Sequence, residues 1–200
     1  MYPNPNIESI PSAWNMDPQP GHRKYANFLV EKIQPQVIVD LGVDYGYSTF
    51  SFAEQGIGHV YGIDSFEGDL HAGFRTDTEE FVHKFQRENN MYNVTFIKGY
   101  FDQVAKNWLK PIDIIHIDGL HTFEAVSTDY ANWAPHVNHN GVILFHDVRS
   151  FDEVKLFFNS LELPKLWFEQ SAGLGIVSRN WQILCNTAKY FPYVNIGQIP

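Results

Sequence analysis

The chain has 200 residues, of which 44% are hydrophobic and only 18% are charged. This composition excludes an intrinsically disordered chain and supplies enough apolar surface for one folded core. Fourteen Lys and Arg residues against 23 Asp and Glu residues give a net charge of −9, and an acidic chain without a basic run argues against a nucleic-acid partner.

Few features of the sequence indicate a compartment. The single cysteine, Cys185, cannot form an internal disulfide or a thiolate metal site. No basic segment followed by an apolar stretch opens the sequence, so no signal peptide is predicted. Apolar runs such as residues 141–145 are far shorter than the roughly 20 residues that span a membrane. We therefore expect a cytoplasmic protein without a membrane span.

The composition divides the chain into three parts. Five of the 11 prolines lie in the first 20 residues, a density that opposes regular structure. We therefore expect residues 1–20 to form a proline-rich N-terminal arm. Residues 21–180 carry the pattern of one folded domain, and residues 181–200 are a C-terminal tail of unknown role.

Within the domain, short apolar runs alternate with helical patterns. This alternation predicts βαβ units, and hence an α/β fold with a mostly parallel sheet covered on both faces. The last two runs have no helix between them and predict an antiparallel edge. Thr76 with Glu79 and Ser150 with Glu153 predict capping boxes at two of the helices. The expected strands are residues 37–40, 59–64, 94–97, 112–118, 141–145, 166–169 and 174–178.

Acidic residues follow four of the first five predicted strands. Asp40, Asp64 and Asp118 end three of them, and His146 with Asp147 ends a fourth. Each acid alone could be a helix cap or a solvated loop residue. Because ligands of such sheets bind beyond the carboxyl ends of the strands, four acids on one edge indicate a ligand site.

The turn after the first strand distinguishes between cofactors. It contains Gly42 and Gly46 with Asp44 between them, and lacks the G-x-G-x-x-G pattern of a dinucleotide site. Asp44 would repel a phosphate and attract a cation, which favours S-adenosylmethionine, with its sulfonium and ammonium groups, over NAD. A simple packing turn is the alternative. The expected cofactor contacts in this turn are Asp40, Gly42, Asp44, Tyr45, Gly46 and Ser48.

The next two strand ends extend the cofactor site. Asp64 lies 24 residues after Asp40, near the spacing at which an acid accepts ribose hydroxyls. Ser65 follows it, and Tyr100 and Phe101 could flank an adenine ring, although core packing explains these rings equally well.

Four segments carry a resemblance to a known family. They are VDLGVDYGYST (39–49), YGIDSFEGDLHAGF (61–74), IDIIHIDGLHTFEAV (112–126) and HNGVILFHDV (139–148), with a weaker match in GLGIV (173–177). The chain resembles class I S-adenosylmethionine-dependent methyltransferases, in the branch of macrocin O-methyltransferase and cephalosporin-hydroxylase-like proteins (methyltransferase domain family 24). The resemblance implies a Rossmann-like, doubly wound seven-stranded sheet of order 3-2-1-4-5-7-6 with the last strand antiparallel.

The resemblance also assigns roles to single residues. Asp69 and His71 match its G-D-x-H-x-G stretch and are expected to contact the cofactor or shape the entrance, unless this is a plain surface loop. Related metal-dependent enzymes bind magnesium through acids at the ends of strands four and five. These positions predict a site for Mg²⁺ or Mn²⁺ formed by Asp118, His146 and Asp147. An acid is common where His146 stands, so this site suits manganese better, and loop hydrogen bonds are the alternative.

His121 is the expected general base. It lies three residues after Asp118, where an imidazole could take the proton from an attacking hydroxyl. Either Asp118 or a metal would orient His121. Asp118 is also an expected cofactor contact, and His146 is the third expected catalytic residue. A capping or cofactor-contacting histidine is the alternative. Strand alternation places His116 inside the sheet, as a core histidine.

The leading interpretation is O-methylation of a sugar, glycan or small-molecule hydroxyl, with the acceptor as partner. A non-catalytic cofactor-binding subunit is the first alternative, and a nicotinamide-dependent oxidoreductase is a weaker one. The aromatic content of 16% also permits a homodimer.

Overall fold

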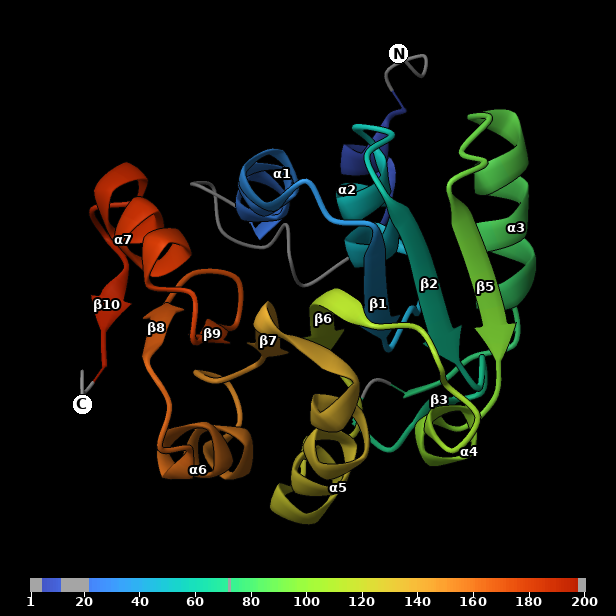
Figure 1. Ribbon diagram of the computed structural model, residues 1–200. Helices are drawn as coiled ribbons and strands as arrows, with labels where there is room; N and C mark the ends of the chain where they lie inside the picture. The colour runs from blue at the N-terminus through green and yellow to red at the C-terminus, as the bar shows by residue number, and fades with distance from the viewer. Residues whose placement is uncertain (1–4, 12–21, 72, 198–200) are drawn as a thin grey trace.

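The computed structural model describes residues 5–11, 22–71 and 73–197, and its centre is one mixed sheet (Figure 1). The strand order is β10-β8-β9-β7-β6-β1-β2-β5. β5, β2, β1, β6 and β7 are parallel, while β9 runs antiparallel to both β7 and β8. These strands are β1 (Val37–Leu41), β2 (His59–Asp64), β5 (Val94–Lys98), β6 (Ile112–Ile117), β7 (Val137–His146), β8 (Lys165–Phe168), β9 (Leu174–Ser178) and β10 (Asn195–Ile196).

The seven-strand order expected from the sequence is confirmed, and the sheet has one strand more. β10 pairs antiparallel with β8. Its two residues are too few to show a hydrophobic period, which is why the sequence does not reveal it. The loop after β2 likewise contains a small hairpin of β3 (Gly68–Asp69) and β4 (Gly73–Phe74).

Helices cover both faces of the sheet, as expected for a doubly wound fold (Figure 1). Buried side chains of α1, α2, α3 and α7 form the core on one face, and those of α4, α5 and α6 form the core on the other. The helices are α1 (His22–Ile33), α2 (Tyr47–Ala53), α3 (Thr78–Glu88), α4 (Phe101–Ala105), α5 (Phe123–Trp133), α6 (Asp152–Ser160) and α7 (Trp181–Tyr190), with short 3₁₀ turns η1 (Ile7–Ser9) and η3 (Ala134–His136).

The segments at both ends pack on this domain. α7 lies beside α1, where the Tyr25 and Thr187 hydroxyls are 3.0 Å apart and Phe191 packs edge-on against Phe28. Before α1, Ile7 and Ile10 are buried in the same core. The rest of the expected arm, residues 1–4 and 12–20, lies outside the described residues.

Neither predicted capping box forms. The residues that precede α3 and α6 are Asp77 and Phe151, and neither side chain caps its helix. Glu153 instead accepts a hydrogen bond from the Phe123 amide at 2.7 Å, which ties the start of α5 to α6.

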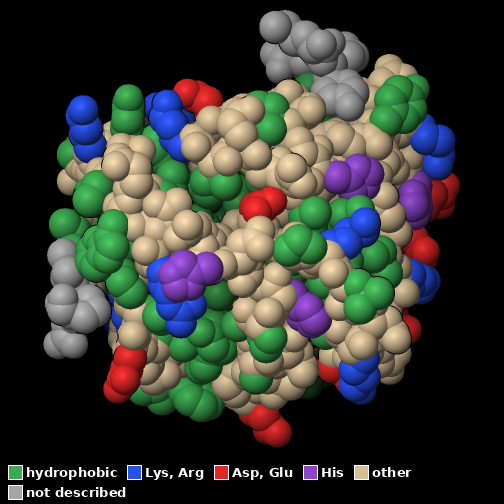
Figure 2. Space-filling view, viewed as in Figure 1, with side chains coloured by type: hydrophobic (Ala, Val, Ile, Leu, Met, Phe, Trp, Pro, Cys, Tyr) green, Lys and Arg blue, Asp and Glu red, His purple; other side chains and the backbone are tan. Residues whose placement is uncertain are grey.

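The charged side chains are spread over the face of the molecule that Figure 2 shows. Basic side chains are scattered over this face rather than gathered in one patch (Figure 2). Among the described residues, no helix is both long and apolar enough to cross a membrane.

Candidate active site

A cavity of about 920 Å³ lies at the carboxyl ends of the parallel strands. It is bounded by the β1–α2 turn, the loop after β2, the start of α4 and the ends of β6 and β7. Eleven of the thirteen residues expected to contact the cofactor line it. They are Gly42, Asp44, Tyr45, Ser48, Asp64, Ser65, Asp69, His71, Tyr100, Phe101 and Asp118.

The β1–α2 turn is held tightly against its neighbours. Gly42 has a φ of +91°, and a Cβ there would lie 1.9 Å from the carbonyl oxygen of Asp118. The carboxylate of Asp64 accepts hydrogen bonds from the amides of Val43 (2.7 Å), Asp44 (3.0 Å) and Phe66 (2.7 Å). The ends of β1, β2 and β6 are therefore fixed relative to one another at the cavity wall.

Asp40 and Gly46 do not line the cavity, against expectation. Asp40 is fully buried, where it accepts hydrogen bonds from the hydroxyls of Ser48 (2.7 Å) and Thr49 (2.5 Å). Its other oxygen lies 2.7 Å from Nδ1 of His116, a core residue on the neighbouring strand. Asp40 therefore anchors α2 and β6 beneath the cavity, and this position corrects its predicted cofactor contact.

Two carboxylates and two imidazoles meet at the ends of β6 and β7. Nε2 of His121 lies 2.7 Å from Asp147 and 3.6 Å from Asp118. Nδ1 of His146 lies 3.2 Å from Asp147 and 3.4 Å from Asp118. Asp147 has a φ of +64°, an unfavourable conformation for a non-glycine residue and one that often marks a functional site.

The charges in this cluster are mutually stabilising. Burial favours the neutral imidazoles, but the neighbouring carboxylates outweigh it and raise the pKa of His121 to about 9 and that of His146 to about 10. Burial would raise the pKa of Asp118 and Asp147, but the two imidazoles hold both below their usual values. Without a metal ion, the cluster therefore holds two carboxylates and two imidazolium ions near neutral pH.

The cluster has the donor set of a divalent-metal site. Ligand atoms of Asp118, His121 and Asp147 lie within 4.8 Å of one another. His146 is the more enclosed imidazole, and its Nε2 donates to the Ser171 carbonyl at 3.0 Å in the β8–β9 turn. That bond directs Nδ1 to the carboxylates, which is the usual arrangement of a metal-binding histidine.

Several residues of the site were not anticipated from the sequence. Phe151 stacks on His121 with ring centroids 4.2 Å apart. It lies beside His71, which was expected at the site and whose ring centroid is 5.4 Å from that of His121. Arg75 pairs with Asp44 at 3.2 Å. Burial raises the pKa of Asp129, which also lines the cavity, to about 7. Only the position of Phe151, four residues after Asp147, could have drawn attention to any of them.

Known proteins match both the sequence and the fold. Residues 39–148, more than half of the chain, match a family described as a methyltransferase domain. The uncharacterized protein y4gI of Sinorhizobium fredii is 31% identical over 173 residues, which cover 78% of this chain and 18% of that protein. The chain therefore spans less than a fifth of the length of this curated relative.

Solved O-methyltransferases share the architecture. One from Bacillus cereus, in complex with SAH, has a TM-score of 0.63 at 16% identity over 86% of both chains. TomG from Streptomyces achromogenes, involved in tomaymycin synthesis and solved with SAM, has a TM-score of 0.60 at 12% identity over 78% of both chains. These likenesses establish the fold, and the match over residues 39–148 shows that the chain belongs to the methyltransferase domain family.

Proposed function

We propose that the protein is an S-adenosylmethionine-dependent O-methyltransferase that binds its cofactor in the 920 Å³ cavity. The observation that carries the proposal is the convergence of the β1–α2 turn, Asp64 and the Asp118–His121–Asp147 cluster on this cavity. SAH and SAM occupy the solved relatives from Bacillus cereus and Streptomyces achromogenes. The acidic residues of the wall suit the cationic groups of the cofactor.

His121 is the proposed general base. When bound, S-adenosylmethionine would supply the methyl group: a lone pair of the acceptor oxygen would form the new C–O bond as the C–S bond breaks, and S-adenosylhomocysteine would be the leaving group. In its neutral form His121, whose Nε2 lies 2.7 Å from Asp147, would take the hydroxyl proton. A cation held by the two carboxylates would favour this neutral form, because it would offset the charges that raise the pKa of the imidazole. The stacked ring of Phe151 limits rotation of this imidazole. The protein otherwise has to align oxygen, methyl carbon and sulfur.

Mg²⁺ or Mn²⁺ fits the cluster. Asp118, Asp147 and Nδ1 of His146 would hold the ion. Nε2 of His121 also lies near both carboxylates, but His121 is the more exposed imidazole and is therefore assigned as the base. When bound, such an ion acts as a Lewis acid that lowers the pKa of an acceptor hydroxyl. Imidazole among the ligands favours Mn²⁺ over Mg²⁺.

The acceptor is proposed to be a sugar, a glycan or another small molecule with a hydroxyl group. The cavity volume of about 920 Å³ lies near the upper end of the range of roughly 300–1,000 Å³ for small-molecule sites. It therefore has room for an acceptor beside the cofactor. The rings of His71 and Phe151 next to His121 offer a stacking surface for it.

Replacing the base tests this proposal directly. We expect His121→Ala to lower transfer of a labelled methyl group to a panel of sugars and catechols by about 10²–10⁴-fold. Its affinity for S-adenosylhomocysteine should stay within about twofold of that of the unaltered protein, since the cofactor contacts remain. His139→Ala, an exposed histidine outside the cavity, is the matched control. Equal turnover of all three proteins would exclude His121 as the base, and cofactor binding without turnover of any acceptor would favour the non-catalytic subunit.

Other expectations from the sequence stay predictions. They concern a cytoplasmic location, a homodimer, the lack of a nucleic-acid partner and the division of the chain at residues 20 and 180.

A further inference from the structure

The segment before α1 reaches the cavity although it lies outside the residues matched by the family. We call residues 5–11 the N-terminal strap. Pro11 at its end is one of the residues that line the cavity. Ile7 and Ile10 are buried in the core, at 0% and 2% exposure, and η1 is closed by hydrogen bonds from the Ser9 amide and hydroxyl to the Asn6 carbonyl. The strap is therefore a packed part of the domain.

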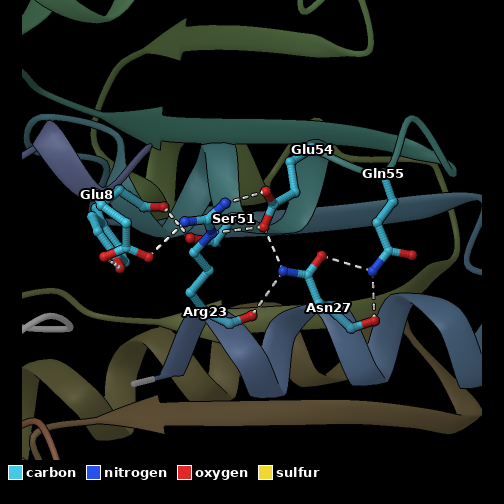
Figure 3. Close-up of polar contacts among 7 residues, drawn as sticks. Glu8, Arg23, Asn27, Ser51, Glu54 and Gln55 are labelled. Atoms are coloured by element: carbon cyan, nitrogen blue, oxygen red, sulfur yellow. Dashed lines mark hydrogen bonds and ion pairs between the residues drawn. The ribbon is translucent and has the colours of Figure 1, made fainter. Parts of the chain in front are cut away.

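Glu8 connects the strap to α1. One of its carboxylate oxygens lies 2.5 Å from Nη1 of Arg23. The same guanidinium donates to both oxygens of Glu54 at the end of α2, at 2.9 and 2.6 Å (Figure 3). Asn27 of α1 also donates to Glu54 and joins Gln55 to this network (Figure 3). Arg23 thus holds the strap, α1 and α2 together.

The other oxygen of Glu8 reaches a wall residue of the cavity. It accepts a hydrogen bond from the Tyr47 hydroxyl at 3.2 Å. Tyr47 is the first residue of α2 and lines the cavity next to the β1–α2 turn. One carboxylate therefore fixes both the strap that carries Pro11 and the tyrosine of the wall.

We propose that the N-terminal strap is a binding element of the cofactor site, in which Ile7 and Glu8 act as positioning residues. The proposal rests on the proposed function. Ile7 anchors the strap in the core, Glu8 sets Tyr47, and Pro11 closes the wall beside the turn. Because the strap is in place before the ligand arrives, binding does not have to order it. Replacing Ile7 or Glu8 should therefore weaken cofactor binding, although neither residue contacts the cofactor.

Calorimetric titration with S-adenosylhomocysteine tests the strap on the full chain. We expect Ile7→Ala to weaken binding by about tenfold and Glu8→Gln, whose ion pair is partly exposed, by about threefold. Ile7→Val, which keeps most of the buried side chain, should restore affinity to within about twofold. Glu31→Gln is the control, since it breaks an exposed pair with Lys32 on the same helix.

Hydrogen exchange of the peptide covering the strap supplies a readout that a purely structural role would not move. We expect S-adenosylhomocysteine to slow exchange of the Ser9 and Ile10 amides by about tenfold, because the ligand binds only the form with the strap in place. If the unaltered protein binds the ligand, but Ile7→Ala and Glu8→Gln bind equally well and the strap gains no protection, the strap proposal is overturned alone. No binding by the unaltered protein would overturn the proposed function and the strap proposal together.

Discussion

His121 and His146 face the same two carboxylates but differ in access to the cavity. The side chain of His146 is 2% exposed and is anchored on the Ser171 carbonyl, whereas His121 is 13% exposed and stacks on Phe151. An enclosed, anchored imidazole suits a metal ligand, and a more accessible one suits a base. The two imidazoles of one cluster are therefore expected to have different roles, His146 as a metal ligand and His121 as the base.

This separation predicts different defects in two alanine variants. We expect His146→Ala to weaken Mn²⁺ binding by at least about tenfold, whereas His121→Ala should change it by less than about threefold. Calorimetric titration of the metal-stripped proteins with MnCl₂ measures both, with His139→Ala as control. The reverse order of affinities would make His121 the ligand and remove it as the base.

Single residues also show where sequence patterns mislead. Asp40 was expected to end its strand as Asp64 does, but β1 continues to Leu41, and only Asp64 lines the cavity. Asp40 lies on the central strand β1, opposite His116 in the register with β6, and this buried neighbour captures its carboxylate. A contact between strands 76 residues apart leaves no local mark on the sequence.

At the scale of elements, the site depends on how closely the β1–α2 turn approaches the end of β6. The Leu41 carbonyl accepts a hydrogen bond from the Asp118 amide at 2.9 Å, and Gly42 packs on the Asp118 carbonyl. The β1–α2 turn and Asp118 are therefore held in fixed positions relative to each other.

This close approach predicts that a single methyl group added at Gly42 strongly lowers the stability of the protein. Gly42→Ala places a Cβ 1.9 Å from the Asp118 carbonyl oxygen at a φ of +91°, so we expect a loss of about 2–4 kcal/mol in the free energy of unfolding. Urea denaturation measures this loss. Gly99→Ala is the control, because its Cβ would meet only the Val104 side chain, at 3.3 Å. A Gly42→Ala protein as stable as the control would contradict the close approach.

Long strands could be predicted from the sequence, whereas very short ones could not. The seven longer strands could be predicted because each has four or more residues with a readable apolar pattern, while their order was implied by the resemblance to the methyltransferase family. β10 and the β3–β4 hairpin have two-residue strands, which carry no period. The capping box at Glu153 failed because the Phe123 amide, 30 residues away in the sequence, is a competing donor.

At the scale of the whole molecule, the cluster couples stability to pH. The pKa values of His121 and His146, about 9 and 10, lie above the ordinary 6.5. Their stabilisation is therefore complete below pH 6.5 and is lost as the pH rises through 9 and 10. The pKa values of Asp118 and Asp147 are lowered, so their contribution is lost as the pH falls below the ordinary 3.8.

The metal-stripped protein should consequently be most stable between about pH 4 and 6.5. We expect its thermal unfolding midpoint to fall steadily from pH 6.5 to pH 10. Scanning calorimetry over this range measures the slope, and His146→Gln, which removes one of the two raised groups, should flatten it. A midpoint independent of pH above 6.5 would contradict the charged state assigned to the cluster.

The central claim is that the cavity binds S-adenosylmethionine. Binding of S-adenosylhomocysteine, the demethylated product, tests this claim most directly. The measurement is a calorimetric titration of the metal-stripped protein with S-adenosylhomocysteine, repeated with Mn²⁺ or Mg²⁺ present and with NAD as the control ligand. We expect one site with a dissociation constant in the micromolar range and no heat of binding from NAD. Absence of binding under every condition, or binding of NAD in its place, would contradict the methyltransferase account.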